Sequence, residues 1–199
     1  MGGGTLGDLG TVLAHLVRRG VPLIHVPTTL LAAVDSSVGG KGAVHARAGG
    51  KWLKNAWGVF HYPHAAWLCP ELWETLDDDQ RRQGAVEALK MDVTLDARGL
   101  ERWARGAPAD LVRKARALKA RVCAADPYDS GGPRRVLNFG HTFGHAFEAI
   151  TGFRLAHGDA VALGMLRALD LGVALGVTSP ALATQVEAAL GRLGAPGRR

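Results

Sequence analysis

The chain has 199 residues, 47% of them hydrophobic and 21% charged, which is typical of one large globular domain or a domain plus part of another. No run of about 18 apolar residues occurs and the first residues lack a signal-peptide pattern, so neither a membrane span nor a leader is expected. The formal charge of +6 fits a basic surface better than nucleic-acid binding, because the arginines are dispersed with few aromatic residues between them. The two cysteines, Cys69 and Cys123, favour a reducing compartment, the cytoplasm, over a disulfide scaffold.

The first third of the chain predicts an α/β piece over 1–69. A glycine-rich turn at 2–8 leads into a helix that closes on Gly20, and 21–27 is typical of a short strand ended by proline. Residues 28–42 predict a helix or turn that runs into a glycine-rich loop. The segment 42–63 is expected to be a loop, and 65–70 a second strand.

Beyond Pro70 the apolar residues recur at helical spacing, which predicts an all-helical piece over 70–199. Helices are expected over 70–96, 108–126, 134–152 and 157–176, with a break at 127–133. The chain begins on a glycine turn that normally follows a strand, and it ends just after a helix. We therefore expect a fragment of a longer protein.

Three histidines lie close together in the sequence. His141 and His145 are four residues apart on one helical face, and His157 opens the next predicted helix. Zinc enzymes often present imidazoles at this spacing, and a catalytic zinc needs three protein ligands, so a metal site is favoured over unrelated core or surface histidines. The spacing leaves open which histidines bind. The candidate carboxylates are Glu87, Glu148, Asp126, Asp129 and Asp159.

Other polar positions are weaker signals by themselves. Backbone N–H groups of the loop at 2–8 could cradle a pyrophosphate, although the loop lacks the G-x-G-x-x-G pattern and could be an ordinary turn. Lys41 could hold a phosphate or carboxylate, but a solvated lysine is the simpler interpretation. Glu87 and Lys90, one turn apart, are more often a surface pair.

Taken together, the stretches "GGGTLGDL", "PTTLLAAVDSSVGGK", "KNAWGVFHYP" and "LNFGHTFGHAFE" resemble the 3-dehydroquinate synthase family. The resemblance extends over about 2–175 and implies a partial Rossmann-like NAD-binding domain at 1–69 and a helical zinc- and substrate-binding domain at 70–199. It implies a lyase of the shikimate pathway that converts the anionic keto-acid phosphate DAHP to 3-dehydroquinate plus phosphate. NAD and Zn²⁺ (or Co²⁺) are the implied cofactors, and the intact protein is expected to be a cytoplasmic homodimer.

The resemblance also implies roles for individual residues. It assigns the metal to Glu87, His141 and His157, and a catalytic or substrate-contacting role to His145. Substrate and phosphate contacts are implied for Lys41, Lys54, Asn55, Lys90, Lys119, Arg134, Asn138 and Arg19, the last reaching the phosphate from a dimer partner. Cofactor contacts are implied for Gly3, Gly4, Asp8, Thr28, Thr29 and Asp35, and Lys54 is also expected on the cofactor side.

Some positions depart from the family pattern. The segment after Lys41 is longer than usual, His45 stands where asparagine is usual, and Asp159 replaces a glutamate. Two alternatives to a dehydroquinate synthase therefore stay open: a related sugar-phosphate cyclase, and an inactive truncated remnant that retains metal binding.

Overall fold

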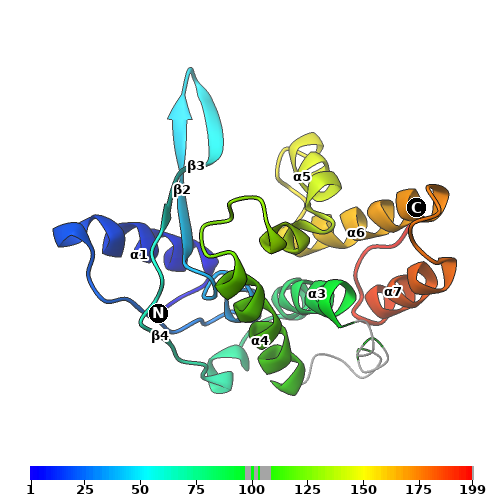
Figure 1. The fold of residues 1–199 in the computed structure, drawn as a ribbon, viewed down its shortest axis with the longest axis horizontal. Helices are drawn as coiled ribbons and strands as arrows, with labels where there is room; N and C mark the ends of the chain where they lie inside the picture. Colours follow the sequence, from blue (N-terminus) through cyan, green and yellow to red (C-terminus); the bar gives the residue numbers. More distant parts are fainter. Residues whose placement is uncertain (97–99, 101–102, 104–108, 199) are drawn as a thin grey trace.

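The structure is a computed structural model that describes residues 1–96, 100, 103 and 109–198. A small α/β part and a long hairpin lie on one side, and a body of helices lies on the other (Figure 1). In chain order the elements are α1 (Gly4–Leu16), η1 (Val17–Arg19), β1 (Ile24–His25), α2 (Leu30–Val34), β2 (Lys41–Ala48), β3 (Lys51–Phe60), β4 (Ala65–Ala66), η2 (Pro70–Trp73), α3 (Asp78–Leu95), α4 (Ala109–Ala125), η4 (Pro133–Asn138), α5 (His141–Ile150), α6 (His157–Ala174) and α7 (Pro180–Arg192). This order confirms the predicted fold class, an α/β piece followed by helices.

The α/β part contains little sheet. The strands predicted at 21–27 and 65–70 form, but each is only two residues long, and β1 pairs in parallel with β4. A parallel bridge between Gly2 and Pro27 extends this pairing toward the chain start. Helix α1 buries only three of its residues, and its apolar side chains Leu6 and Leu9 are among those left exposed.

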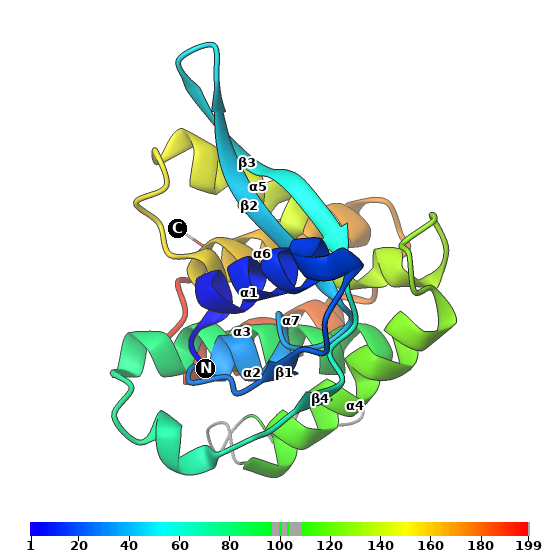
Figure 2. The same ribbon diagram turned by 90° about the vertical axis from the view of Figure 1, so that its left-hand side faces the viewer.

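The segment 42–63 is not the predicted loop. Strands β2 and β3 form an antiparallel hairpin that runs from the pair Lys41–Phe60 to the pair Ala48–Lys51 and projects from the molecule (Figures 1 and 2). Gly49 and Gly50 make the turn with φ of 56° and 78°, the left-handed conformation of a tight hairpin turn. The prediction was wrong because the many glycines and small residues hide the two-residue period, although a Gly-Gly pair between two strands is itself a hairpin signal.

The helical body contains the main hydrophobic core. Val86, Leu89 and Met91 of α3 are fully buried, and they belong to one cluster with Val161 and Met165 of α6. Helix α3 therefore lies at the centre, with α4, α6 and α7 around it (Figure 1). Among the described residues, no helix is both long enough and apolar enough to cross a bilayer.

The predicted helices form with two corrections. The segment expected to be one helix over 70–96 is divided, because 3-10 helix η2 ends at Trp73 and Asp77 caps a new helix, α3, that begins at Asp78. The segment expected to be one helix over 134–152 is divided, because 3-10 helix η4 ends at Asn138 and Gly140 adopts a left-handed conformation before α5 begins. The helix expected over 108–126 is α4, and the first residue of that prediction lies outside the described residues. The break at 127–133 is confirmed as far as Gly132, since η4 begins at Pro133.

Glycines set the distances between the helices that surround the site. A Cβ on Gly84 of α3 would lie 2.5 Å from the backbone N of Leu31 in α2. A Cβ on Gly158 of α6 would lie 2.7 Å from Cα of Gln83 in α3. Real Cβ atoms do not approach other atoms this closely, so these helices meet backbone to backbone. Consequently the residues at the start of α6 are held next to the middle of α3.

Candidate functional site

A cavity of about 460 Å³ opens between the base of the hairpin, the start of α1, and helices α3, α4, α5 and α6. Most of the residues singled out from the sequence line it. They are Gly4, Asp8, Asp35, Lys41, Lys54, Asn55, Lys90, Lys119, Arg134, Asn138, His141, His145 and His157. The fold thus brings side chains from both halves of the chain to one place.

The other predicted residues lie around the cavity rather than on its wall. Glu87 is fully buried beneath the histidines. Gly3 caps the start of α1 and lies against Thr29, whose hydroxyl accepts a hydrogen bond from the N–H of Ala32 at the start of α2. Thr28 donates its backbone N–H to the carbonyl of Gly2. Arg19 is exposed at the end of η1 and is not among the described residues that line the cavity.

Glu87, His141 and His157 form a compact cluster of possible metal ligands. One ligand atom from each lies within 4.8 Å of the others, and Nε2 of each histidine is 3.7 Å from Oε1 of Glu87. Ligands bound to one zinc at about 2.0–2.1 Å in tetrahedral geometry are about 3.4 Å apart, so the three ligand atoms would move closer together around a bound ion. His145 lies beside the cluster, with its ring centroid 5.3 Å from that of His141.

Hydrogen bonds point both histidines of the cluster toward Glu87. Nδ1 of His141 is 3.3 Å from the carbonyl oxygen of Phe139, and Nδ1 of His157 is 3.1 Å from Oε1 of Glu148. Both partners are acceptors, so each Nδ1 carries the proton and donates it. The Nε2 lone pairs then face the carboxylate, which is the arrangement of metal-binding histidines supported by outer-shell acceptors.

The environment of Glu87 also fits a cation. Both of its oxygens are buried and accept no hydrogen bond from the described residues, although Lys90 Nζ forms an ion pair with it, 2.5 Å from Oε2. Burial, and then the charge of Lys90, lowers the pKa of His141 to about 4, so its imidazole is neutral and free to bind a metal near pH 7. The donor set of two imidazoles and one carboxylate is one that zinc uses in catalytic sites.

Carboxylates hold the cations that face the cavity. Lys41 pairs with Asp129, and Lys119 Nζ is 2.6 Å from Asp35 Oδ1. Lys54 Nζ is 2.8 Å from Glu148 Oε2. Sequence reasoning considered Asp129 and Glu148 only as possible metal ligands, and their placement beside lysines from the hairpin had no sequence signal.

Arg134 is held differently from the lysines. Its guanidinium is buried, donates to the carbonyl oxygens of Gly39 and Pro127, and lies 5.7 Å from the ring centroid of Phe60.

Another contact at the cavity is made by the hairpin itself. The backbone N–H of Asn55 donates to Nδ1 of His45. His45, a departure from the family pattern, therefore fixes the backbone of a cavity residue in the left-handed region, where φ of Asn55 is 53°.

Two acidic groups in the cavity have pKa values that move in opposite directions. Burial, and then the nearby charge of Asp35, raises the pKa of Asp8 to about 6. For Asp35 burial alone would raise the pKa, but Lys119 and then Lys90 outweigh it, and the pKa falls well below its usual range. Asp35 is therefore ionised near pH 7, while Asp8 takes up a proton on mild acidification.

The raised pKa of Asp8 predicts a pH-dependent stability. The folded chain keeps the proton of the Asp8 carboxyl group to a higher pH than the unfolded chain does. The stability that this proton contributes is therefore complete below the unfolded pKa of 3.8 and is lost as the pH rises through about 6. The free energy of unfolding of Asp8→Asn should therefore equal that of wild type at about pH 4 and exceed it by about 1 kcal/mol at about pH 8. This value is reduced because solvent screens the charge of the partly exposed Asp8. Urea unfolding at both pH values measures this difference. Glu74→Gln, at an exposed carboxylate, is the control, and an equal gain there would contradict the prediction.

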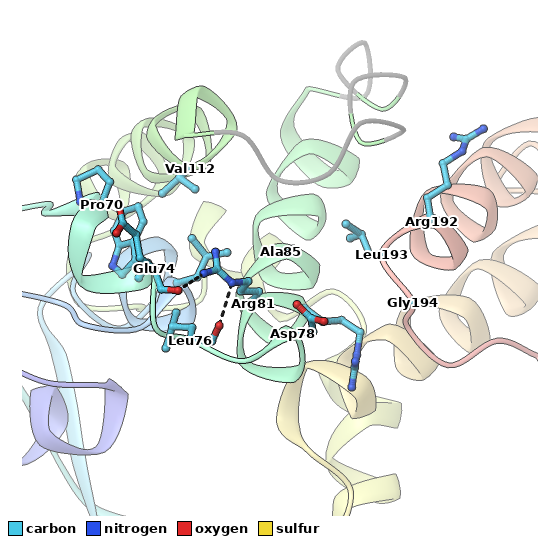
Figure 3. A pocket seen from close by; sticks show the side chains of 13 residues that line it. Pro70, Glu74, Leu76, Asp78, Arg81, Ala85, Val112, Arg192, Leu193 and Gly194 are labelled. Atoms are coloured by element: carbon cyan, nitrogen blue, oxygen red, sulfur yellow. Dashed lines mark hydrogen bonds between the residues drawn. The ribbon is translucent and has the colours of Figure 1, made fainter.

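A second cavity, of about 740 Å³, lies between η2, the start of α3 and the end of α7 (Figure 3). Its lining mixes apolar side chains with charged ones, and Arg81 donates to the carbonyl oxygens of Glu74 and Leu76. The described residues that line it include no histidine or cysteine. The smaller cavity, which is lined by histidines as well as by lysines, is therefore the candidate site.

Comparisons with known proteins identify the family of the chain. The model of the 3-dehydroquinate synthase N-terminal family matches residues 1–83, and that of the C-terminal family matches residues 72–198. A 3-dehydroquinate synthase from Rhodospirillum rubrum is 43% identical over 209 residues, which cover 98% of this chain and 53% of that protein. A 2-epi-valiolone synthase from Actinosynnema mirum is 41% identical, with 98% and 53% covered.

A solved structure is similar along the whole chain. It is that of 2-epi-5-epi-valiolone synthase from Streptomyces hygroscopicus subsp. jinggangensis 5008 with NAD⁺ and Zn²⁺ bound, with a TM-score of 0.87 and 28% identity. The match covers 100% of this chain and 57% of that one, so the chain spans about half the length of the relatives it matches. Because the two family models together match nearly all of its residues, the chain belongs to the 3-dehydroquinate synthase family.

Proposed function

We propose that the chain forms the site-bearing part of a 3-dehydroquinate synthase, which converts DAHP to 3-dehydroquinate and phosphate with NAD and Zn²⁺ or Co²⁺. One observation carries the proposal: the cluster of Glu87, His141 and His157 faces a cavity lined by lysines and an arginine. A small substrate that carries both a phosphate and a carboxylate needs such a cation-rich wall. The bound metal would supply a Lewis acid for a substrate oxygen, and NAD would supply a hydride acceptor.

The protein's own residues would bind the substrate and move its protons. Lys41, Lys119 and Lys54 can exchange their present carboxylate partners for the phosphate and carboxylate of the substrate, which would stabilise the departing phosphate. Lys90 and Asn138 line the same wall and would position substrate oxygens. Burial, and then the charge of Lys54, lowers the pKa of His145, so its neutral ring could accept a proton from the substrate.

The cofactor would occupy the α1 side of the cavity. Gly3 provides no side-chain cap for α1, so the first N–H groups of this helix are available to a pyrophosphate. Gly4, Asp8 and Asp35 line this side, with Thr28 and Thr29 just behind it. We propose these residues as the contacts of NAD, with Lys54 between cofactor and substrate.

Further proposals concern the organisation of the protein. We propose a partial NAD-binding domain at 1–69 and a zinc- and substrate-binding domain at 70–199.

Arg18 and Arg19 both have left-handed backbone conformations, with φ of 48° and 66°, and such strain is often retained where a side chain must be presented. We propose that Arg19 reaches the phosphate in the cavity of a second copy in a homodimer. The free cysteines Cys69 and Cys123 support a reducing, cytoplasmic location.

A second candidate function is that of a related sugar-phosphate cyclase. The observation in its favour is the 41% identity to a 2-epi-valiolone synthase, close to the 43% found for a dehydroquinate synthase. The two functions differ in the acid groups of the substrate. DAHP carries a carboxylate besides its phosphate, whereas the phosphate of a simple sugar carries no carboxylate. The identity of the accepted substrate therefore separates them.

Phosphate release by the purified chain tests the proposal. With NAD and zinc present, we expect release from DAHP, no release when either cofactor is omitted, and 3-dehydroquinate as the product by mass spectrometry. Release only from a sugar phosphate without a carboxylate would support the second candidate. Binding of about one zinc per chain without release from either substrate would support the third alternative, a remnant that retains its metal site.

A further inference from the structure

We propose that Glu148 is a positioning residue that connects the metal site to the hairpin. One of its oxygens holds His157 as the tautomer that can bind a metal, and the other holds Lys54 of β3. The inference rests on the proposed metal site, and the experiments below distinguish failure of one from failure of the other.

The geometry around Glu148 is specific. Glu148 lies on α5 seven residues after His141, and two helical turns place both side chains on one face of that helix. The residue is 5% exposed, its Oε1 is 3.1 Å from His157 Nδ1, and its Oε2 is 2.8 Å from Lys54 Nζ. Helix α5 therefore provides one proposed ligand directly and supports a second ligand from the next helix.

The chemistry of a carboxylate fixes the tautomer of His157. An ionised carboxylate only accepts hydrogen bonds, so the proton must be on Nδ1, and the lone pair of Nε2 is left facing Glu87 at 3.7 Å. The negative charge also makes the imidazole a stronger donor to a metal. The equivalent support for His141 comes from a backbone carbonyl, that of Phe139, so only the support of His157 can be removed by a side-chain substitution.

The second carboxylate oxygen of Glu148 connects the hairpin to the proposed metal site. Lys54 comes from a strand of the projecting hairpin, and its ion pair with Glu148 joins segments 94 residues apart in the chain. The Lys54 side chain is 37% exposed whereas that of Glu148 is 7% exposed, so Lys54 can leave toward an anion while Glu148 stays in place. Loss of Lys54 should then leave the bond to His157 intact, and loss of Glu148 should remove both connections.

The tautomer can be measured in the metal-free wild-type chain. At pH 8 the imidazole ¹⁵N shifts of His157 should show a protonated Nδ1 and an unprotonated Nε2, and Glu148→Ala should shift His157 toward a mixture of the two tautomers. A wild-type chain with the proton on Nε2 would overturn the proposal, whether or not the chain binds metal and whether or not any variant folds.

Metal affinity provides the second test, by chelator competition with Zn²⁺. Glu148→Gln keeps the shape of the side chain but removes its charge, and should weaken binding about 10–100-fold. Lys54→Met should stay within about threefold of wild type. Glu187→Gln, which removes a carboxylate of α7 that pairs with Arg198, is the matched control, and its zinc affinity should be unchanged.

The outcomes separate the two proposals. Zinc binding that is lost in Glu87→Ala but unchanged in Glu148→Gln would overturn the role of Glu148 and leave the metal site standing. Zinc binding that is insensitive to Glu87→Ala would overturn the metal site itself, and the tautomer of His157 would then decide the role of Glu148 alone.

Discussion

Glu87→Ala is expected to abolish binding of a divalent metal and to destabilise the metal-free chain by about 3–5 kcal/mol. Glu87 is fully buried and supplies the only carboxylate of the proposed ligand set. Its Oε2 is 2.5 Å from Nζ of Lys90, which is 2% exposed, so removal of Glu87 leaves a buried ammonium without its partner. Zinc content after dialysis and urea unfolding of the metal-free chain measure the two effects separately.

A double variant separates the ligand from the ion pair. Glu87→Leu combined with Lys90→Met removes both buried charges, and such replacements are often neutral or stabilising. We expect this variant to regain most of the lost stability without regaining zinc. If Glu87→Ala instead bound zinc with wild-type affinity, Glu87 would not be a ligand.

Gly164→Ala is expected to destabilise the chain by about 3 kcal/mol, at the upper end of what overpacking usually costs. A Cβ at this position of α6 would lie 2.0 Å from the carbonyl oxygen of Gly140 and 2.8 Å from the backbone N of Gly144. These are backbone atoms, which cannot rotate away, so α5 must move as a whole. Because His141 directly follows Gly140, we also expect zinc affinity to fall about tenfold or more, as when the support of a ligand is lost.

The same substitution at an open helical position is the control. Gly10 lies in the interior of α1, and a Cβ there would meet nothing within 4 Å. Gly10→Ala should stabilise the chain by about 1 kcal/mol, because alanine is the better helix former. Equal effects of the two substitutions, measured by urea unfolding, would show that α5 and α6 do not cross as closely as described.

The sequence predicted the helices well where their signal is local. The long apolar periodicities gave α4, α6 and the end of α3 within a few residues, because the helical period depends only on neighbours along the chain. The start of α3 was placed too early, at 70 rather than at Asp78. The hairpin was missed, since β2 contains Val44 but no other β-branched residue and no Phe, Tyr or Trp, the residues that mark a strand. Its stability comes instead from pairing and from packing of its base on α1, where a Cβ on Gly42 would lie 2.4 Å from Cβ of Thr11.

The candidate site divides in the same way. By itself the sequence determined that His141 and His145 share one helical face and that His157 opens the next helix, because the geometry of a helix fixes such spacings. The spacing by itself could not determine which of five carboxylates joins them, and only the family resemblance pointed to Glu87. The tertiary structure places Glu87 at the histidines, turns Asp159 to Arg82 and Asp129 to Lys41, and sets Glu148 behind His157.

That choice depends on how closely the helices approach one another. Gly84, Gly158 and Gly164 let α2, α3, α5 and α6 meet at backbone distance, and a shift of one methyl group at any of these contacts would move a candidate ligand. Contacts between distant segments follow from the packing of the whole core, and a pattern of neighbouring residues does not contain them. The residue types of the site were therefore determined by the sequence, and their partners were decided only by the tertiary structure.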